Sequence, residues 1–127
     1  MRHPTAGRHP RRGESGAVSA EAAMALPTLV VLTVALAWIV SYGVTQVRVV
    51  DAARETARAA ARADTAVDAA SLGRRVAPRG ARVSVSAGPE TVVARVSATV
   101  RGPGGVFARL GPVTVSSEAV AAAEPTW

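Results

Sequence analysis

Few residue types in this chain of 127 residues could carry out catalysis, and their positions do not favour it. The only histidines, His3 and His9, lie near the N-terminus, and the chain contains no cysteine. Serines recur in strand-like segments, but a serine needs a neighbouring base to become a nucleophile, and no histidine follows His9. These serines are Ser84, Ser86, Ser97, Ser116 and Ser117. The glycine and proline cluster at 102–105 is typical of a turn rather than of a phosphate-binding loop. We therefore predict no enzyme activity, catalytic residue, metal site or cofactor.

The basic composition does not indicate nucleic-acid binding either. The formal net charge is +6 and the pI is about 11.6, with every basic side chain an arginine. These arginines are dispersed along the chain, and aromatic residues make up only 3% of it. Because single-stranded nucleic acids are bound by aromatic stacking beside a continuous basic groove, we predict no nucleic-acid partner.

Glu21 is the ionisable residue whose position most needs an explanation. It directly precedes a run without charge, residues 22–46. The apolar part, residues 22–40, would form a helix of roughly 29 Å, close to the roughly 30 Å of a bilayer's hydrocarbon core. Trp38 and Tyr42 lie near its end, where amphipathic rings prefer the membrane interface. The pattern predicts a transmembrane helix in the lipid bilayer, with these two rings as interface anchors.

Two further features bear on the shape of this helix and on its orientation in the membrane. Pro27 interrupts the apolar run and is expected to kink the helix or to free a backbone carbonyl. Four arginines precede the run and four follow it closely, so the positive-inside rule does not decide the orientation. They are Arg2, Arg8, Arg11 and Arg12 before the run, and Arg48, Arg54, Arg58 and Arg62 after it.

The residues before Glu21 suggest a proteolytic processing site. Gly16 lies five positions before Glu21 and ends a short basic segment, which resembles the leader of type IV pilin-like proteins. On this resemblance the leader is residues 1–16, the mature chain begins at Ala17, and removal of the leader lowers the formal charge from +6 to +3. The new amino group of Ala17 would be largely protonated near neutral pH. It could pair with the Glu21 carboxylate of its own chain or of a neighbour.

The resemblance extends to the TadE-like minor pilins of the tight-adherence (Flp) pilus system. It rests on the segment GAVSAEAAMALP and the alanine- and arginine-rich helix after it, and is most specific over residues 13–62. Gly16, Ala17, Glu21 and Pro27 occupy the family's positions, which implies roles in processing and in setting the register between packed helices. This chain differs from the family's pattern in two features. Ala22 stands where an aromatic residue is common, and the cysteines of some relatives are missing.

The resemblance also implies partners and a location. The expected partners are a prepilin peptidase, other pilin-like subunits through the N-terminal helix, and the membrane platform of the pilus. The expected location is the cytoplasmic (inner) membrane, crossed once, with the N-terminus cytoplasmic and the C-terminal region outside. The sequence leaves open whether the protein enters a surface filament, primes it or stays in the membrane.

Two other interpretations compete with the pilin hypothesis. The residues Ala35 to Ala37 fit the small-x-small site of a secretory signal peptide, so a signal peptidase could cut after Ala37. The apolar run continues past that point and is longer than usual for such a signal. The second alternative is a generic single-pass anchored protein in which Glu21 merely flanks the membrane.

The C-terminal half predicts a helix followed by strands. Alanine is abundant from Arg48 to about Ser71, without glycine or proline, which favours a continuing helix. A small-residue seam is expected along it, formed by Val50, Ala53, Ala57, Ala60 and Val67. Alternating apolar residues then predict three strands, in the segments ARVSVSA, TVVARVSATVR and VTVSSEAV, with a turn at 88–90 and a flexible loop containing Phe107.

Together these segments predict an α+β fold. A long N-terminal transmembrane and amphipathic helix would carry a small antiparallel three-stranded sheet packed on its outer half. The expected divisions are a leader at 1–16, a transmembrane helix at 17–47, its extracytoplasmic continuation at 48–72, and a β region at 73–127.

Overall fold

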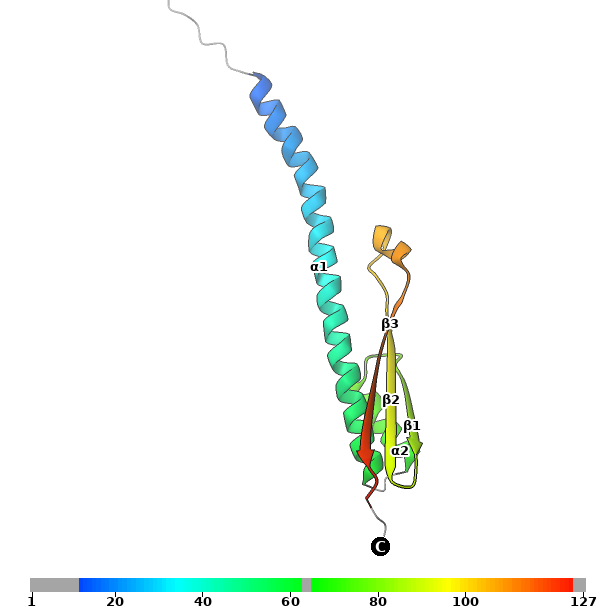
Figure 1. Cartoon of the computed structure of the whole chain (residues 1–127). Helices are drawn as coiled ribbons and strands as arrows, with labels where there is room; N and C mark the ends of the chain where they lie inside the picture. Colours follow the sequence, from blue (N-terminus) through cyan, green and yellow to red (C-terminus); the bar gives the residue numbers. More distant parts are fainter. Residues whose placement is uncertain (1–11, 63–64, 125–127) are drawn as a thin grey trace, which may run out of the picture. The chain divides into compact units, whose positions relative to one another are not determined.

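The structure is a computed structural model that describes residues 12–62 and 65–124. Its elements follow one another as helices α1 and α2, strands β1 and β2, a short 3-10 helix η1, and strand β3 (Figure 1). Contacts divide the chain into two compact units between Leu36 and Ala37, and helix α1, Arg12–Ala61, contributes to both. The predicted α+β class is confirmed.

The chain does not form the single long helix expected to continue to about Ser71. Helix α1 ends at Ala61, and a second helix, α2, spans Ala66–Val76. The start of α2 is fixed by Thr65, whose hydroxyl oxygen accepts a hydrogen bond from the Asp68 backbone N–H at 3.2 Å. The same hydroxyl lies 2.6 Å from Oδ2 of Asp68 and donates to it. This arrangement stabilises a new helix start, so the prediction of an unbroken helix over 48–72 was wrong.

The three predicted strands are present and form one antiparallel sheet in the order β1-β2-β3. They span Arg82–Ala87, Thr91–Val100 and Val113–Ala122. The expected turn at 88–90 is confirmed, since it joins β1 to β2 and the Gly88 N–H bonds the Thr91 carbonyl at 2.8 Å. In β2 the predicted alternation is confirmed, because the apolar positions face inward. The buried side chains are Val92, Ala94, Val96 and Ala98.

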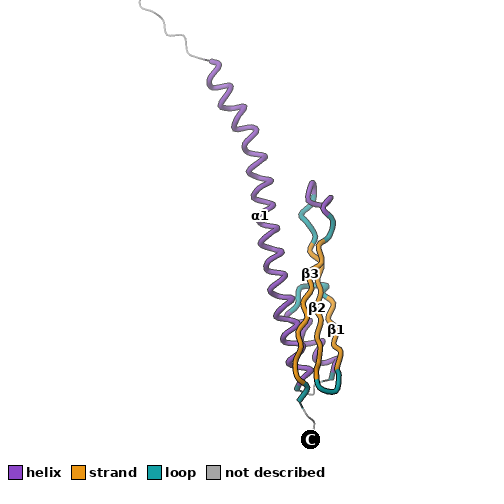
Figure 2. The backbone as a smooth tube through the Cα atoms, viewed as in Figure 1, coloured by secondary structure: helices purple, strands orange, loops and turns teal. Residues whose placement is uncertain are grey.

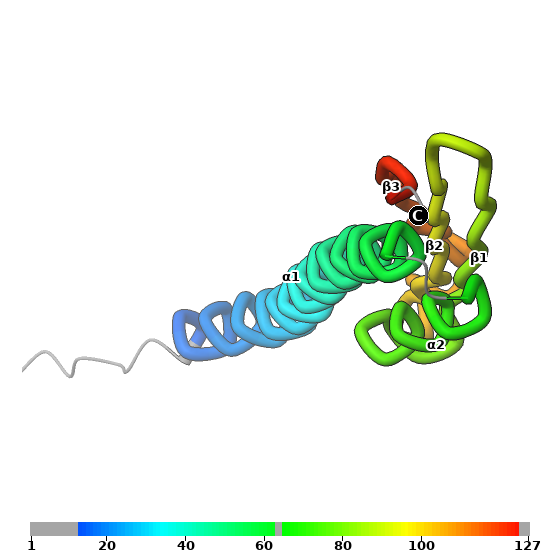
Figure 3. Tube along the Cα trace, turned by 90° about the horizontal axis from the view of Figure 1, so that it is seen from below, coloured from blue at the N-terminus to red at the C-terminus, as the bar shows by residue number. Residues whose placement is uncertain are grey.

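We call the second compact unit, residues 37–127, the outer unit. Its core joins α1 and α2 to one face of the sheet. Val49, Ala52 and Ala53 of α1 pack with Val96 and Ala98 of β2. Figure 3 shows the end of α1 beside β2 and β3, with α2 beside β1. The largest fully buried side chains are only Val49, Val96 and Thr56, so the layers approach closely but bury little volume.

The predicted small-residue seam is only partly correct. Ala53 and Ala57 are buried, as expected, and Val50 and Ala60 are half-buried. Val67 instead lies on α2 and is 75% exposed. The difference follows from the break between the helices, which changes the face that residues beyond Ala61 present to the sheet.

The connection between β2 and β3, residues 101–112, is more ordered than the flexible loop expected there. It contains the 3-10 helix η1, Gly105–Leu110, and lies beyond the ends of the two strands it joins (Figure 2). The helix ends at Gly111, whose φ of 74° suits a residue without a Cβ atom. Near the other end of the connection, a Cβ atom on Gly102 would lie 2.8 Å from the carbonyl oxygen of Phe107. We call residues 101–112 the tip loop.

Candidate functional site

The predicted processing site lies near the start of α1. Because this helix begins at Arg12, the peptide bond between Gly16 and Ala17 is inside helical backbone. Gly16, Ala17 and Glu21 are all exposed, and a Cβ atom on Gly16 would meet nothing within 4 Å. Residues 17 and 21 are one helical turn apart and therefore share a face. The first eleven residues of the predicted leader, including both histidines, lie outside the described residues.

Pro27 is accommodated within α1. The helix continues through this residue, and the Thr28 hydroxyl donates to the Met24 carbonyl at 3.1 Å. Since proline has no N–H, the carbonyl of Ala23, four residues before it, lacks its usual helical donor. The predicted free carbonyl therefore follows from the covalent structure of proline.

The first half of α1 exposes large apolar side chains that other described residues do not cover. Met24 is 79% exposed, and α1 is long and apolar enough to cross a membrane. The remaining exposed apolar residues of this stretch include Leu26, Leu29, Val30, Val31, Leu32, Leu36, Ile39 and Val40. Leaving so large an apolar surface in water would be unfavourable, so this half of the helix requires lipid or other helices around it.

Serine and threonine hydroxyl groups between residues 19 and 45 of α1 find their hydrogen-bond acceptors within the helix itself. Five serine and threonine side chains each donate to the carbonyl four residues earlier, at 2.8–3.1 Å. They are Ser19, Thr28, Thr33, Ser41 and Thr45. In hydrocarbon every polar group must find its partner inside the protein, so these bonds suit a helix surrounded by lipid.

The two aromatic side chains predicted as interface anchors lie in the outer unit and contact the tip loop and β3 within it. The Trp38 ring packs against Phe107 of the tip loop, with ring centroids 6.2 Å apart. Trp38, Ile39 and Tyr42 line an apolar pocket of about 150 Å³ together with Val113 of β3. Trp38 Nε1 is buried and has no hydrogen-bond partner among the described residues. The sequence singled out Phe107 only as the one phenylalanine of a loop, and gave no signal for this long-range contact.

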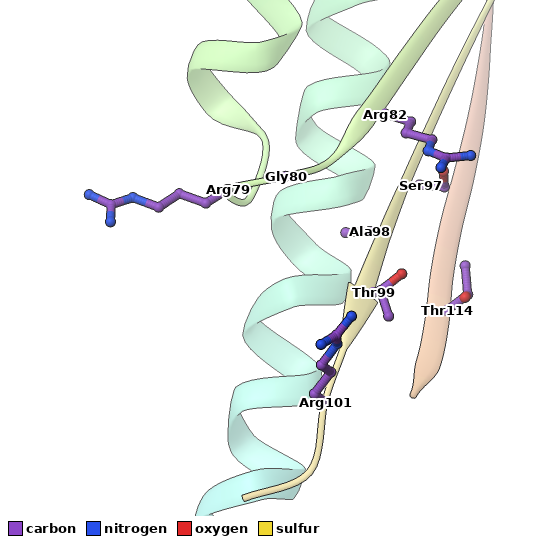
Figure 4. A pocket seen from close by; sticks show the side chains of 8 residues that line it. All are labelled: Arg79, Gly80, Arg82, Ser97, Ala98, Thr99, Arg101 and Thr114. Carbon is purple, nitrogen blue, oxygen red and sulfur yellow. The ribbon is translucent and has the colours of Figure 1, made fainter. Parts of the chain in front are cut away.

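A second feature missed in the sequence is a shallow basic pocket of about 460 Å³ on the outer unit. Its lining includes Arg79, Arg82 and Arg101, and the other lining residues are Gly80, Ser97, Ala98, Thr99 and Thr114. Figure 4 shows Arg82 beside Ser97, whereas Arg79 points away from the strands. The three guanidinium groups thus do not converge on one point, so the pocket is poorly suited to a single small anion.

The described residues do not bring together an arrangement for catalysis. No group of three or more histidine, cysteine, aspartate or glutamate side chains that could hold a metal ion occurs among them. Ser84, Ser86, Ser97 and Ser116 lie on the polar face of the sheet, and Ser117 is half-buried on its inner face. No histidine lies within residues 12–62 or 65–124.

An apolar N-terminal helix long enough to cross a membrane, followed by a small helix-covered sheet, supports a membrane-anchored protein. Residues 16–58 match the family described as TadE-like protein. The chain is also 42% identical over 106 residues to Apoptosis inhibitor Rv3655c of Mycobacterium tuberculosis (strain ATCC 25618 / H37Rv), covering 83% of this chain and 78% of that relative. The chain belongs to the TadE-like family, whose members are structural proteins associated with pili. No solved structure matches it.

Proposed function

We propose that this protein is a minor pilin or pseudopilin of a tight-adherence (Flp) pilus, cleaved by a prepilin peptidase after Gly16. The observation that carries the proposal is the exposed apolar half of α1, with Glu21 at its N-terminal end. Such a helix can be held by lipid before assembly and by neighbouring pilin-like helices after it. The match to TadE-like proteins, which begins at Gly16, supports this role.

Glu21 and Ala17 would fix the register between packed helices. In the membrane the Glu21 carboxylate lies at the edge of the apolar run, near headgroups and water. In a bundle of pilin-like helices it is drawn into apolar surroundings, where an unpaired carboxylate is costly. The protonated amino group of Ala17 from an adjacent subunit would offset that cost. The interaction requires cleavage, because Ala17 has no free amino group in the uncut chain.

The proposal also sets the orientation and the partners. Cleavage on the cytoplasmic face places the N-terminus inside, and residues 48–127 are then extracytoplasmic. The protein would contact the prepilin peptidase first, then the membrane platform of the pilus and other pilin-like subunits. Apart from the leader, the proposed divisions are a membrane segment at 17–47 and an outer part that includes α2 and the sheet.

One observation favours a second candidate, a small exported domain released by signal peptidase. The boundary between the two compact units falls between Leu36 and Ala37, one residue before the predicted signal-peptidase cut after Ala37. A cut after Ala37 would therefore leave the contacts of the outer unit, including Trp38 with Phe107, largely intact. The mature protein would then have no anchor.

The N-terminus of the mature protein separates these cases. In the native host we expect intact mass and N-terminal sequencing to give a chain that begins at Ala17. Replacement of Gly16 by leucine should abolish this cleavage, because the bulky side chain would hinder the peptidase at the scissile bond. Gly13→Leu is the matched control, since it lies in the same helix, has open space around it, and should leave processing unchanged.

A start at Trp38 would instead establish the exported domain, and an intact leader would leave a generic anchored protein. Cleavage after residue 16 that is equally efficient in the Gly16→Leu variant would also contradict the proposed peptidase.

A further inference from the structure

The topology places the tip loop at the end of the apolar run. Trp38 lies within the last residues of that run, and its ring contacts Phe107 of the tip loop. Val113, where β3 begins, lines the same pocket as Tyr42. Because Trp38 belongs to the segment that enters the membrane, whatever contacts it lies at the membrane surface.

The tip loop also exposes apolar side chains that have no cover within the described part of the chain. Phe107 is half-buried, but Val106 and Leu110 are 74% and 64% exposed. Both belong to the short helix η1, together with the exposed Arg109. Apolar side chains mixed with arginine are typical of segments that insert shallowly at a membrane interface.

The same end of the sheet is basic. The antiparallel order brings the start of β1, the end of β2 and the start of β3 together, which places Arg82 at the same end of the sheet as Arg101, the first residue of the tip loop. Arg79 precedes β1, and no aspartate or glutamate occurs within residues 69–89 or 91–117. The acidic Glu90 lies in the turn at the opposite end of the sheet. The distribution of charge therefore complements an anionic surface.

We propose that the tip loop is a second membrane anchor, which inserts Val106 and Leu110 among anionic phospholipid headgroups where α1 leaves the bilayer. Arg79, Arg82, Arg101 and Arg109 would bind the lipid phosphates. The guanidinium groups of Arg79, Arg82 and Arg101 do not converge on one point, which suits a surface of many separate phosphates better than one bound anion. A protein partner at this level would have to displace the headgroups around Trp38. The inference needs the membrane helix but not pilin processing.

The absence of cysteine allows a direct measurement of this contact. Ala108 is exposed in η1, and Glu90 is exposed at the far end of the sheet. Ala108→Cys and Glu90→Cys in the full chain each take one environment-sensitive fluorescent label, and the protein is reconstituted into vesicles. In vesicles rich in phosphatidylglycerol, the label at residue 108 should emit at shorter wavelength and be several-fold less quenched by aqueous acrylamide than in phosphatidylcholine. The label at residue 90 should be quenched equally in both.

The arginines are tested on the Ala108→Cys background. Arg101→Gln with Arg109→Gln should lower the ratio of inserted to free loop about thirtyfold, since each arginine near an anionic surface contributes about a five- to sixfold factor. Arg54→Gln with Arg58→Gln removes the same charge from an exposed part of α1 and should leave the label unaffected.

Equal quenching at residues 108 and 90 in phosphatidylglycerol vesicles would overturn the proposal, because the tip loop would then lie in water. Protection of residue 108 that does not depend on lipid charge but is lost on diluting the protein within the vesicles would also overturn it. That result would assign the surface to a second copy of the chain.

Discussion

At the scale of single residues, Glu21 is exposed and directly precedes the uncharged run of α1, residues 22–46. The sequence predicts a role for it from its type and its distance from Gly16, and that role stays a prediction. The structure adds that the helix already spans the Gly16–Ala17 bond. If the proposed peptidase binds an extended substrate, this first part of α1 has to unwind before the proposed cleavage.

Glu21→Gln keeps the side-chain shape and removes the charge, so membrane insertion and cleavage after Gly16 should largely persist. Assembly should fall, because the buried Ala17 ammonium of the neighbouring subunit loses its partner. Breaking a buried ion pair costs about 3–5 kcal/mol, which corresponds to at least about a hundredfold weaker association. The measurement is co-purification with partner pilins from the native host. Glu14→Gln is the matched control, because it removes an acid that leaves with the leader.

If the Glu21→Gln protein co-purifies with pilins as well as the unsubstituted protein does, Glu21 merely flanks the membrane helix and the proposed register pair does not exist.

At the scale of elements, the close approach of α1 and α2 depends on Gly73. A Cβ atom at this position would lie 1.9 Å from Thr56 Oγ1 and 3.3 Å from Val83 Cγ1. Thr56 is fully buried, and its hydroxyl donates to the Ala52 carbonyl at 2.7 Å, so it has little freedom to move. Glycine is therefore required at the point where the two helices and β1 meet.

Gly73→Ala should lower the free energy of unfolding of the full chain in detergent by about 1–3 kcal/mol, because the new methyl group overpacks the core. Thr56→Ala removes the nearest atom, so the double variant should recover part of this loss, with a coupling of at least about 0.5 kcal/mol. Denaturant titration followed by circular dichroism measures all the variants. Gly43→Ala, which adds a methyl group in open space on α1, should cause no loss. Purely additive losses, or a Gly73→Ala protein of normal stability, would contradict the packing described here.

The sequence predicted the strands better than it predicted the helices and the loop. Alternation in β2 follows directly from one buried face, so period two was sufficient to identify its inward residues. The break after Ala61 had a local signal, a threonine followed three residues later by an aspartate, which the abundance of alanine obscured. The contact of Trp38 with Phe107 depends on how β2 and β3 place the tip loop, and no local pattern encodes such a placement.

At the scale of the whole molecule, the chain combines an apolar first half of α1, whose large side chains are exposed among the described residues, with a small outer unit whose core is built from small side chains. The outer unit is a compact unit of its own, and the residues of α1 before Ala37 belong to the other one. We propose that this structural member of a pilus-associated family gains its remaining contacts from lipid and from other subunits. On this proposal, pilin-like helices replace lipid around this part of α1.

The replacement of lipid by pilin-like helices is tested by identifying what lies beside Leu29, which is 56% exposed in the middle of the apolar run. A photo-crosslinking amino acid is placed at this position in the native host while pili are being made. We expect crosslinks to pilin-like subunits, and their loss in the Gly16→Leu background, where the uncut protein stays in the membrane. In cells that assemble complete pili, adducts only with lipid or with a second copy of this chain would contradict the proposal that helices of other pilin-like subunits surround this part of α1.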